Sequence, residues 1–169
     1  MRIKNVSDGF GYLEQIMQLQ KKLCECGELS DYLVIQENVL KSNFGSPNQV
    51  TLVAEENSEV VGFSVIGIKS RGTIDPYDPF LDCKILRVLG IPVPMIYHNL
   101  LNASELRVKR DYAVSSCDIR VVDEDHGTEK VCKGVVEERD YRAINSEFSP
   151  KIKRPITLYK KELLKNKNN

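Results

Sequence analysis

Cysteine and histidine, the residues that most often bind metals or act as nucleophiles, are sparse in this sequence. They stand at Cys24, Cys26, Cys83, Cys117, Cys132, His98 and His126. A zinc site needs paired C-x-x-C or Cys/His clusters, and only Cys24-Glu25-Cys26 comes close to that spacing. We therefore expect no metal site, and we expect most of the cysteines to be small buried apolar residues.

Motifs for nucleotides and for hydrolytic chemistry are also weak. Gly9-Phe10-Gly11 lies between a predicted strand and a predicted helix, but Glu14 replaces the third glycine of G-x-G-x-x-G. A diphosphate approaches the backbone closely only where that third residue is small, so we interpret this segment as a flexible turn. The sequence contains no G-x-S-x-G, no Walker lysine loop and no H-E-x-x-H motif.

Charged residues gather in two places. The acidic stretch Asp123-Glu124-Asp125 either attracts a cationic substrate or forms a solvated strand end. Residues 151–169 contain seven Lys or Arg residues against Glu162 alone. That segment either contacts an acidic partner weakly or protects an edge strand with its lysines.

Composition limits the class of protein. The chain has 169 residues, of which 41% are hydrophobic and 28% are charged, as expected for one globular domain. The 24 basic residues equal the 24 acidic ones, which argues against a nucleic-acid partner. No apolar run approaches the length of a membrane span, and the N-terminus lacks the apolar core of a secretory signal. We expect a cytoplasmic protein without a membrane partner.

Hydrophobic spacing predicts the elements in order. A short strand over 3–6 precedes a helix over 12–26, and a second helix runs from Ser30 or Asp31 to 44–45. Asn57-Ser58 joins strands over 50–56 and 59–68 as a hairpin. Further along we expect a strand over 80–89, a helix over 96–113, a strand over 117–122, a helix over 128–139 and strands over 141–148 and 156–164.

This order, β-α-α-β-β-β-α-β-α-β-β, predicts an α/β (α+β) fold with a mixed, mostly antiparallel sheet of about seven strands and helices on both faces. Nothing in the composition marks a second domain. We therefore expect one domain over 1–164 and a polar, frayed tail over 165–169.

The element order and four strings resemble the GCN5-related N-acetyltransferase (GNAT) superfamily, with the diamine (spermidine-type) acetyltransferases closest in pattern. The resemblance covers nearly the whole chain. The strings are Leu52-Val53-Ala54-Glu55 with Val60-Val61-Gly62-Phe63, then Phe80-Leu81-Asp82-Cys83-Lys84-Ile85-Leu86, then Ile119-Arg120-Val121-Val122 through Glu137-Glu138-Arg139-Asp140-Tyr141-Arg142, and Thr157-Leu158-Tyr159-Lys160-Lys161-Glu162-Leu163.

In that family acetyl-CoA lies in a V where the fourth and fifth strands separate, and an amine attacks the thioester directly while a carboxylate takes its proton. The resemblance implies acetyl-CoA as cosubstrate. It makes Asp82 the candidate general base, with a surface carboxylate at a strand end as the alternative. The separation of the strands would fall beside Leu86. The residues implied to bind the cofactor are Leu86, Arg87, Val88, Leu89 and Gly90.

The sequence departs from the family at two functional places. The family's R/Q-x-x-G-x-G/A loop binds the diphosphate through backbone amides. In one register it falls on residues 91–96, where Pro92 and Pro94 remove N–H donors. In the other register, residues 87–92 match except for Pro92, and about seven extra residues must precede the fifth strand. Val136 stands where a tyrosine commonly protonates the leaving thiolate.

We therefore hypothesise an N-acetyltransferase that moves an acetyl group from acetyl-CoA to a primary amine of a small molecule. The alternative is a catalytically degenerate member of the fold that acts as a binding or regulatory module. A homodimer is expected only because dimers are common in the family.

Overall fold

The computed structural model describes residues 1–6, 10–44, 46–70, 81–112 and 114–163. The predicted loop around 75–79 and the tail 165–169 lie outside these residues. The elements, in chain order, are β1 (Arg2–Asn5), α1 (Phe10–Glu25), η1 (Asp31–Leu33), α2 (Glu37–Asn43), β2 (Gln49–Glu56), β3 (Glu59–Ser70), β4 (Leu81–Gly90), α3 (Pro94–Tyr112), β5 (Ser116–Val122), α4 (Gly127–Glu138), β6 (Arg142–Ser149) and β7 (Arg154–Glu162).

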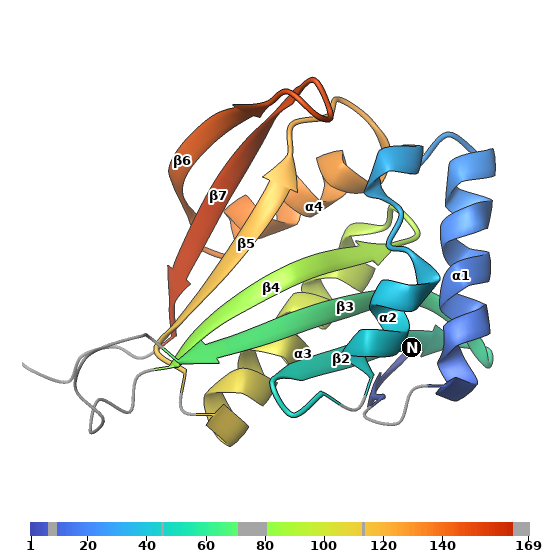
Figure 1. Cartoon of the computed structure of the whole chain (residues 1–169), viewed down its shortest axis with the longest axis horizontal. Helices are drawn as coiled ribbons and strands as arrows, with labels where there is room; N and C mark the ends of the chain where they lie inside the picture. The colour runs from blue at the N-terminus through green and yellow to red at the C-terminus, as the bar shows by residue number, and fades with distance from the viewer. Residues whose placement is uncertain (7–9, 45, 71–80, 113, 164–169) are drawn as a thin grey trace, which may run out of the picture.

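One seven-stranded sheet organises the molecule, in the order β1-β2-β3-β4-β5-β7-β6. Every neighbouring pair is antiparallel except β4 and β5, which are parallel. Helices α1 and α2 cover one face, and α3 and α4 cover the other (Figure 1). The predicted fold class and element order are confirmed. None of the helices in the described ranges is both long and apolar enough to cross a membrane.

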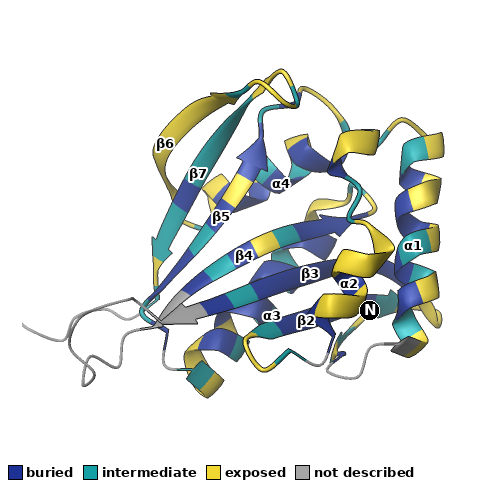
Figure 2. Cartoon of the chain, in the orientation of Figure 1, coloured by how far each residue is buried: buried dark blue, intermediate teal, exposed yellow. Residues whose placement is uncertain are grey.

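Two buried clusters hold the layers together. One packs the inner sides of α3 and α4 against the sheet, and the other packs α1, η1 and α2 against the opposite face. The predicted hairpin is confirmed, because Asn57 and Ser58 have φ values of 50° and 68° and join β2 to β3 in a two-residue turn. Strand β6 is exposed along nearly all of its length (Figure 2).

The predicted second helix over residues 30–45 is wrong in one respect, because it is broken into η1 and α2. The buried Gln20 side chain causes the break. Its Oε1 accepts the N–H of Ile35 at 2.8 Å, and its Nε2 donates to the Ile35 carbonyl at 3.2 Å. These bonds replace helical ones, so the chain runs extended between η1 and α2. Ser30 makes no capping hydrogen bond and donates instead to Glu124.

Helix α3 begins two residues earlier than predicted. Pro94 is its first residue, a position at which the missing N–H of proline costs nothing. The three residues between Gly90 and Pro94 form the whole connection from β4 to α3. Residues 87–90 of one predicted diphosphate-loop register therefore lie within β4, and residues 91–93 of the other form the connection itself.

Strands β4 and β5 pair over only four residues and then separate. The pairs run from Asp82 with Ser116 to Ile85 with Ile119. Beyond Ile85, β4 continues with β3 alone, and the register of that pairing skips Leu86 as a β-bulge. Strand β5 continues with β7 up to Val122. The predicted separation of the two sheet halves beside Leu86 is confirmed.

Candidate active site

Among the described residues, no strand pairs with the edge of β4 that faces β5 from Leu86 to Gly90. All five residues predicted to bind the cofactor lie along this edge. Leu86 is 41% exposed, and its side chain lies over Gly67, on the face that α1 covers further along the sheet. Val88 and Leu89 are buried and belong to the clusters on opposite faces. The backbone groups along this edge are the ones that remain to bind a ligand between the strands.

Gly90 has partners within the chain. Its N–H donates to the Tyr97 hydroxyl at 3.2 Å, and that hydroxyl donates to the Gly90 carbonyl at 3.0 Å. A Cβ at Gly90 would lie 2.8 Å from the Val61 carbonyl oxygen. The glycine therefore lets the sheet and the start of α3 approach closely. The N–H of Ile91 also has a partner, the Val61 carbonyl at 2.9 Å.

The carboxylates near the separation lie on β4 and β5. Asp82 pairs with Ser116 and stands four residues before Leu86, about 13 Å along an extended strand. The placement of its side chain lies outside what the structure describes. Asp118 pairs with Lys84, two residues before Leu86. It shares the face of Gly67 because Gly67, Lys84 and Asp118 form one row across the sheet.

Asp118 was missed in the sequence, although its signal is present there. Ile119 and Val121 alternate with Asp118 and Arg120, which places the two charged residues on the face opposite the buried pair. That face carries no helix over β5, so Asp118 is half-buried and Arg120 is exposed. A carboxylate beside the gap was therefore detectable from strand periodicity.

An ion pair spans the gap between the separated strands. Nη1 of Arg87 on β4 lies 2.7 Å from Oε1 of Glu129 on α4. The other carboxylate oxygen of Glu129 accepts the N–H of Val122, the last residue of β5, at 2.8 Å. Nη2 of Arg87 donates to the Leu33 carbonyl of η1 at 3.2 Å. Both walls of the gap and η1 are thus joined through one guanidinium and one carboxylate.

Burial sets the electrostatics of this cluster. Burial raises the pKa of Glu129, and the Arg87 charge opposes that shift. Burial also raises the pKa of the Cys132 thiol and places the pKa of Tyr97 well above its ordinary value. Tyr97, Glu129 and Cys132 are thus all buried, and Arg87 is the charged partner of Glu129.

An apolar residue, Val136, occupies the position on α4 at which the resemblance leads us to look for a tyrosine. Val136 is fully buried in the core and supplies no proton. Tyr141 follows α4 but donates to Glu105 at 3.1 Å, in a cluster with Arg139 and Lys161. Glu124 from the acidic stretch is buried and accepts hydrogen bonds from Ser30 and Tyr32. The stretch is therefore partly structural.

Cysteines and metal ligands add little to the site. Cys83, Cys117 and Cys132 are buried, as predicted for most of the cysteines, whereas Cys26 is exposed and Cys24 is half-buried. Within the described ranges, no three His, Cys, Asp or Glu side chains lie where they would hold one metal ion.

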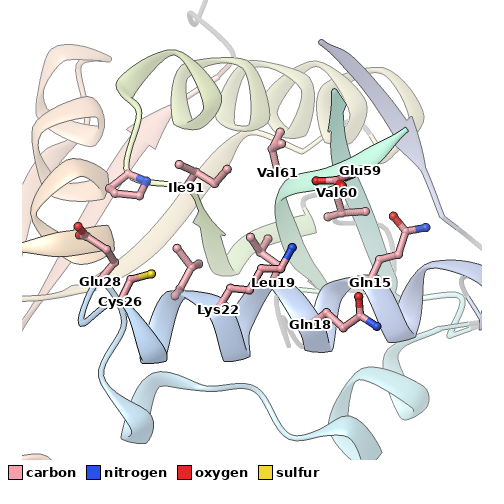
Figure 3. A pocket seen from close by; sticks show the side chains of 12 residues that line it. Gln15, Gln18, Leu19, Lys22, Cys26, Glu28, Glu59, Val60, Val61 and Ile91 are labelled. Atoms are coloured by element: carbon pink, nitrogen blue, oxygen red, sulfur yellow. The ribbon is translucent and has the colours of Figure 1, made fainter. Parts of the chain in front are cut away.

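A cavity of about 590 Å³ lies between α1 and the first residues of β3, and is also lined by Ile91 and Pro92, which follow β4. Figure 3 shows Leu19 and Lys22 of α1 opposite Val60, Val61 and Ile91. The loop residues Cys26 and Glu28 also line the cavity. Gln15, Gln18 and Glu59 supply further polar groups to its wall. Ile91 follows Leu86 by five residues, so the cavity begins where the unpaired edge of β4 ends.

Comparison with known proteins gives the fold. No family model and no curated protein sequence matches the chain. Among solved structures, it is similar to the aminoglycoside 6'-N-acetyltransferase from Enterococcus faecium, with 13% identity, 99% of this chain and 100% of that one covered, and a TM-score of 0.73.

Two further structures agree with that similarity. An aminoglycoside 6'-N-acetyltransferase complexed with coenzyme A has 14% identity, covers 99% of this chain and 100% of its own, and has a TM-score of 0.72. The ribosomal-protein-S18-alanine N-acetyltransferase from Escherichia coli has 8% identity, covers 99% of both chains and has a TM-score of 0.70. The chain therefore has the fold of the GNAT N-acetyltransferases.

Proposed function

We propose that this protein is an N-acetyltransferase that uses acetyl-CoA as acetyl donor. The observation that carries the proposal is the separation of β4 and β5 beside the bulged Leu86, which leaves backbone groups of β4 without a strand partner. A pantetheine arm contains two amides, which complement such an edge as a short strand does. Similarity to a structure complexed with coenzyme A supports the same ligand.

In the proposed reaction the amine lone pair attacks the thioester carbonyl, a C–N bond forms and the C–S bond breaks. Coenzyme A leaves as a thiolate that takes up a proton, and a carboxylate receives the proton of the attacking amine. Residues 86–89 of β4 would hold the pantetheine and polarise the carbonyl through backbone N–H groups. Asp82 is the proposed base, acting through a water because of its distance from Leu86.

The proposed acceptor is a primary amine of a small molecule. The aminoglycoside enzymes of similar fold act on such amines, and the resemblance to the diamine branch favours a polyamine. The homodimer and the cytoplasmic location remain predictions from the sequence.

Calorimetry with coenzyme A and thermal melting with acetyl-CoA test the donor. We expect saturable binding and a rise in melting temperature that grows with ligand concentration. An acetylation assay over spermidine, an aminoglycoside, an amino acid and a peptide N-terminus then identifies the acceptor. Absence of binding at millimolar coenzyme A would contradict the proposal and leave the non-catalytic alternative.

A further inference from the structure

The ion pair between Arg87 and Glu129 lies between β4 and the end of β5, where the proposed cofactor would enter. Arg87 projects from the unpaired edge of β4, and Glu129 is held at the end of β5 by the Val122 N–H. A pantetheine arm lying between these strands would meet the guanidinium and the carboxylate. The pair must therefore separate or shift before the arm enters.

The segment between α1 and η1 (residues 26–30) lies over the ion pair between Arg87 and Glu129. The Thr128 N–H donates to the Glu28 carbonyl at 2.8 Å, and Gly127 allows this approach because a Cβ there would lie 2.3 Å from that carbonyl oxygen. Leu29 and Leu33 are buried in the cluster that also contains Leu89 of β4 and Val122 of β5. The segment, the ion pair and the start of α4 thus close the wide end of the gap together.

We propose that Glu129 is a gate residue, which holds Arg87 across the gap between β4 and β5 and is displaced when the cofactor binds. The inference rests on the proposed function. It assigns to Glu129 a role in setting cofactor affinity that the resemblance does not give to any residue of α4.

The energetics permit reversible opening. The Arg87 and Glu129 side chains are 18% and 3% exposed, so both charges lose most of their hydration in the closed state. This desolvation cancels much of the attraction between the buried charges, so the intact pair adds little net stability, whereas removal of one partner leaves the other charge buried without compensation and destabilises the closed state. The segment between α1 and η1 has no helix or strand of its own, and the buried Leu29 and Leu33 side chains that hold it must move when it opens.

Two variants test the gate against coenzyme A and against pantetheine, which lacks phosphates. Glu129→Gln keeps an oxygen for the Val122 N–H and removes the charge that holds Arg87. Arg87→Met keeps the apolar stem and removes the guanidinium. If the closed state dominates in the unmodified protein, both variants should bind both ligands at least about tenfold more tightly than it does. The reason is that apparent affinity is proportional to the fraction of molecules in the open state. Stopped-flow measurements should show faster association.

Asp123→Asn is the matched control, since it removes a 2.7 Å ion pair to Lys133 of the same helix at a solvated position. Its ligand affinity should equal that of the unmodified protein. Thermal melting shows whether each variant is folded. If one of the two gate variants is unfolded, the ligand affinity of the other tests the proposal. If a folded Glu129→Gln or Arg87→Met variant binds coenzyme A and pantetheine with unchanged or lower affinity, the gate proposal is wrong and the proposed acetyltransferase function is unaffected. Absence of coenzyme A binding in every protein, the unmodified chain included, would overturn the proposed function and the gate together.

Discussion

Two aspartates lie on the strands that separate, and their positions give them different claims to act as the base. Asp82 stands four residues from Leu86 and Asp118 pairs with Lys84, only two residues from it. Lys84 and Lys160 are the row neighbours of Asp118, and Lys69 is a row neighbour of Asp82, so both aspartates have lysines beside them in the sheet register. Asp82 is the proposed base because the resemblance implies that role, and Asp118 is the informative comparison.

We expect Asp82→Asn to lower kcat by about a hundredfold or more and to leave KM for acetyl-CoA unchanged, because the amide cannot accept the proton. Asp82→Glu should retain activity, since the longer side chain reaches further. Steady-state kinetics with a responsive amine measures both. If Asp118→Asn, and not Asp82→Asn, abolishes turnover, the base lies on β5.

At the scale of elements, the glycine that ends β4 controls how closely the strand packs. Gly90 pairs with Gly62, and a Cβ on Gly62 would lie 2.7 Å from Ile96 of α3. The two glycines together allow the first turn of α3 to rest on the sheet. This packing fixes the orientation of α3 relative to the end of β4.

We expect Gly90→Ala to lower the free energy of unfolding by about 1–3 kcal/mol through overpacking against the Val61 carbonyl. Gly134→Ala is the matched control, because Gly134 lies inside α4 with no atom within 4 Å of an added Cβ. It should raise stability by about 0.5–1 kcal/mol through helix propensity. Urea denaturation of both variants measures these changes, and equal effects would contradict the packing argument.

At the scale of the whole molecule, the two sheet halves are joined by a shared buried core and by two polar clusters. On the α3 face, Glu105 accepts hydrogen bonds from Arg139, Lys161 and Tyr141 at 2.8–3.2 Å. Arg139 follows α4, Tyr141 precedes β6, and Lys161 lies on β7, so Glu105 of α3 connects to three segments of the other half. The ion pair between Arg87 and Glu129 joins the halves through the gap.

We expect Glu105→Ala to destabilise the protein by about 3–5 kcal/mol, since two largely buried cations lose their partner. Glu37→Ala is the control, because Glu37 pairs with Lys41 on the exposed surface of α2. That change should stay within about 0.5 kcal/mol. Denaturation curves compare the two, and a small effect at Glu105 would show that the core alone joins the halves.

Local patterns predicted most of the fold, because strand and helix periods are local properties. The hairpin at Asn57-Ser58 is an example. The break between η1 and α2 was missed because Gln20 reaches Ile35 across fifteen positions. The residues that span the gap are 42 positions apart, so no spacing rule brings Arg87 to Glu129. The separation of the strands was anticipated only from the resemblance.

The short parallel pairing of β4 with β5 makes the molecule divisible. The chain passes from one half to the other once, between α3 and β5. Residues 1–112 and 114–169, expressed as separate fragments, therefore retain five of the six strand pairings, and only the four residue pairs between β4 and β5 are lost. They should reassociate by complementation, and a cofactor that binds between them would strengthen the reassembled heterodimer.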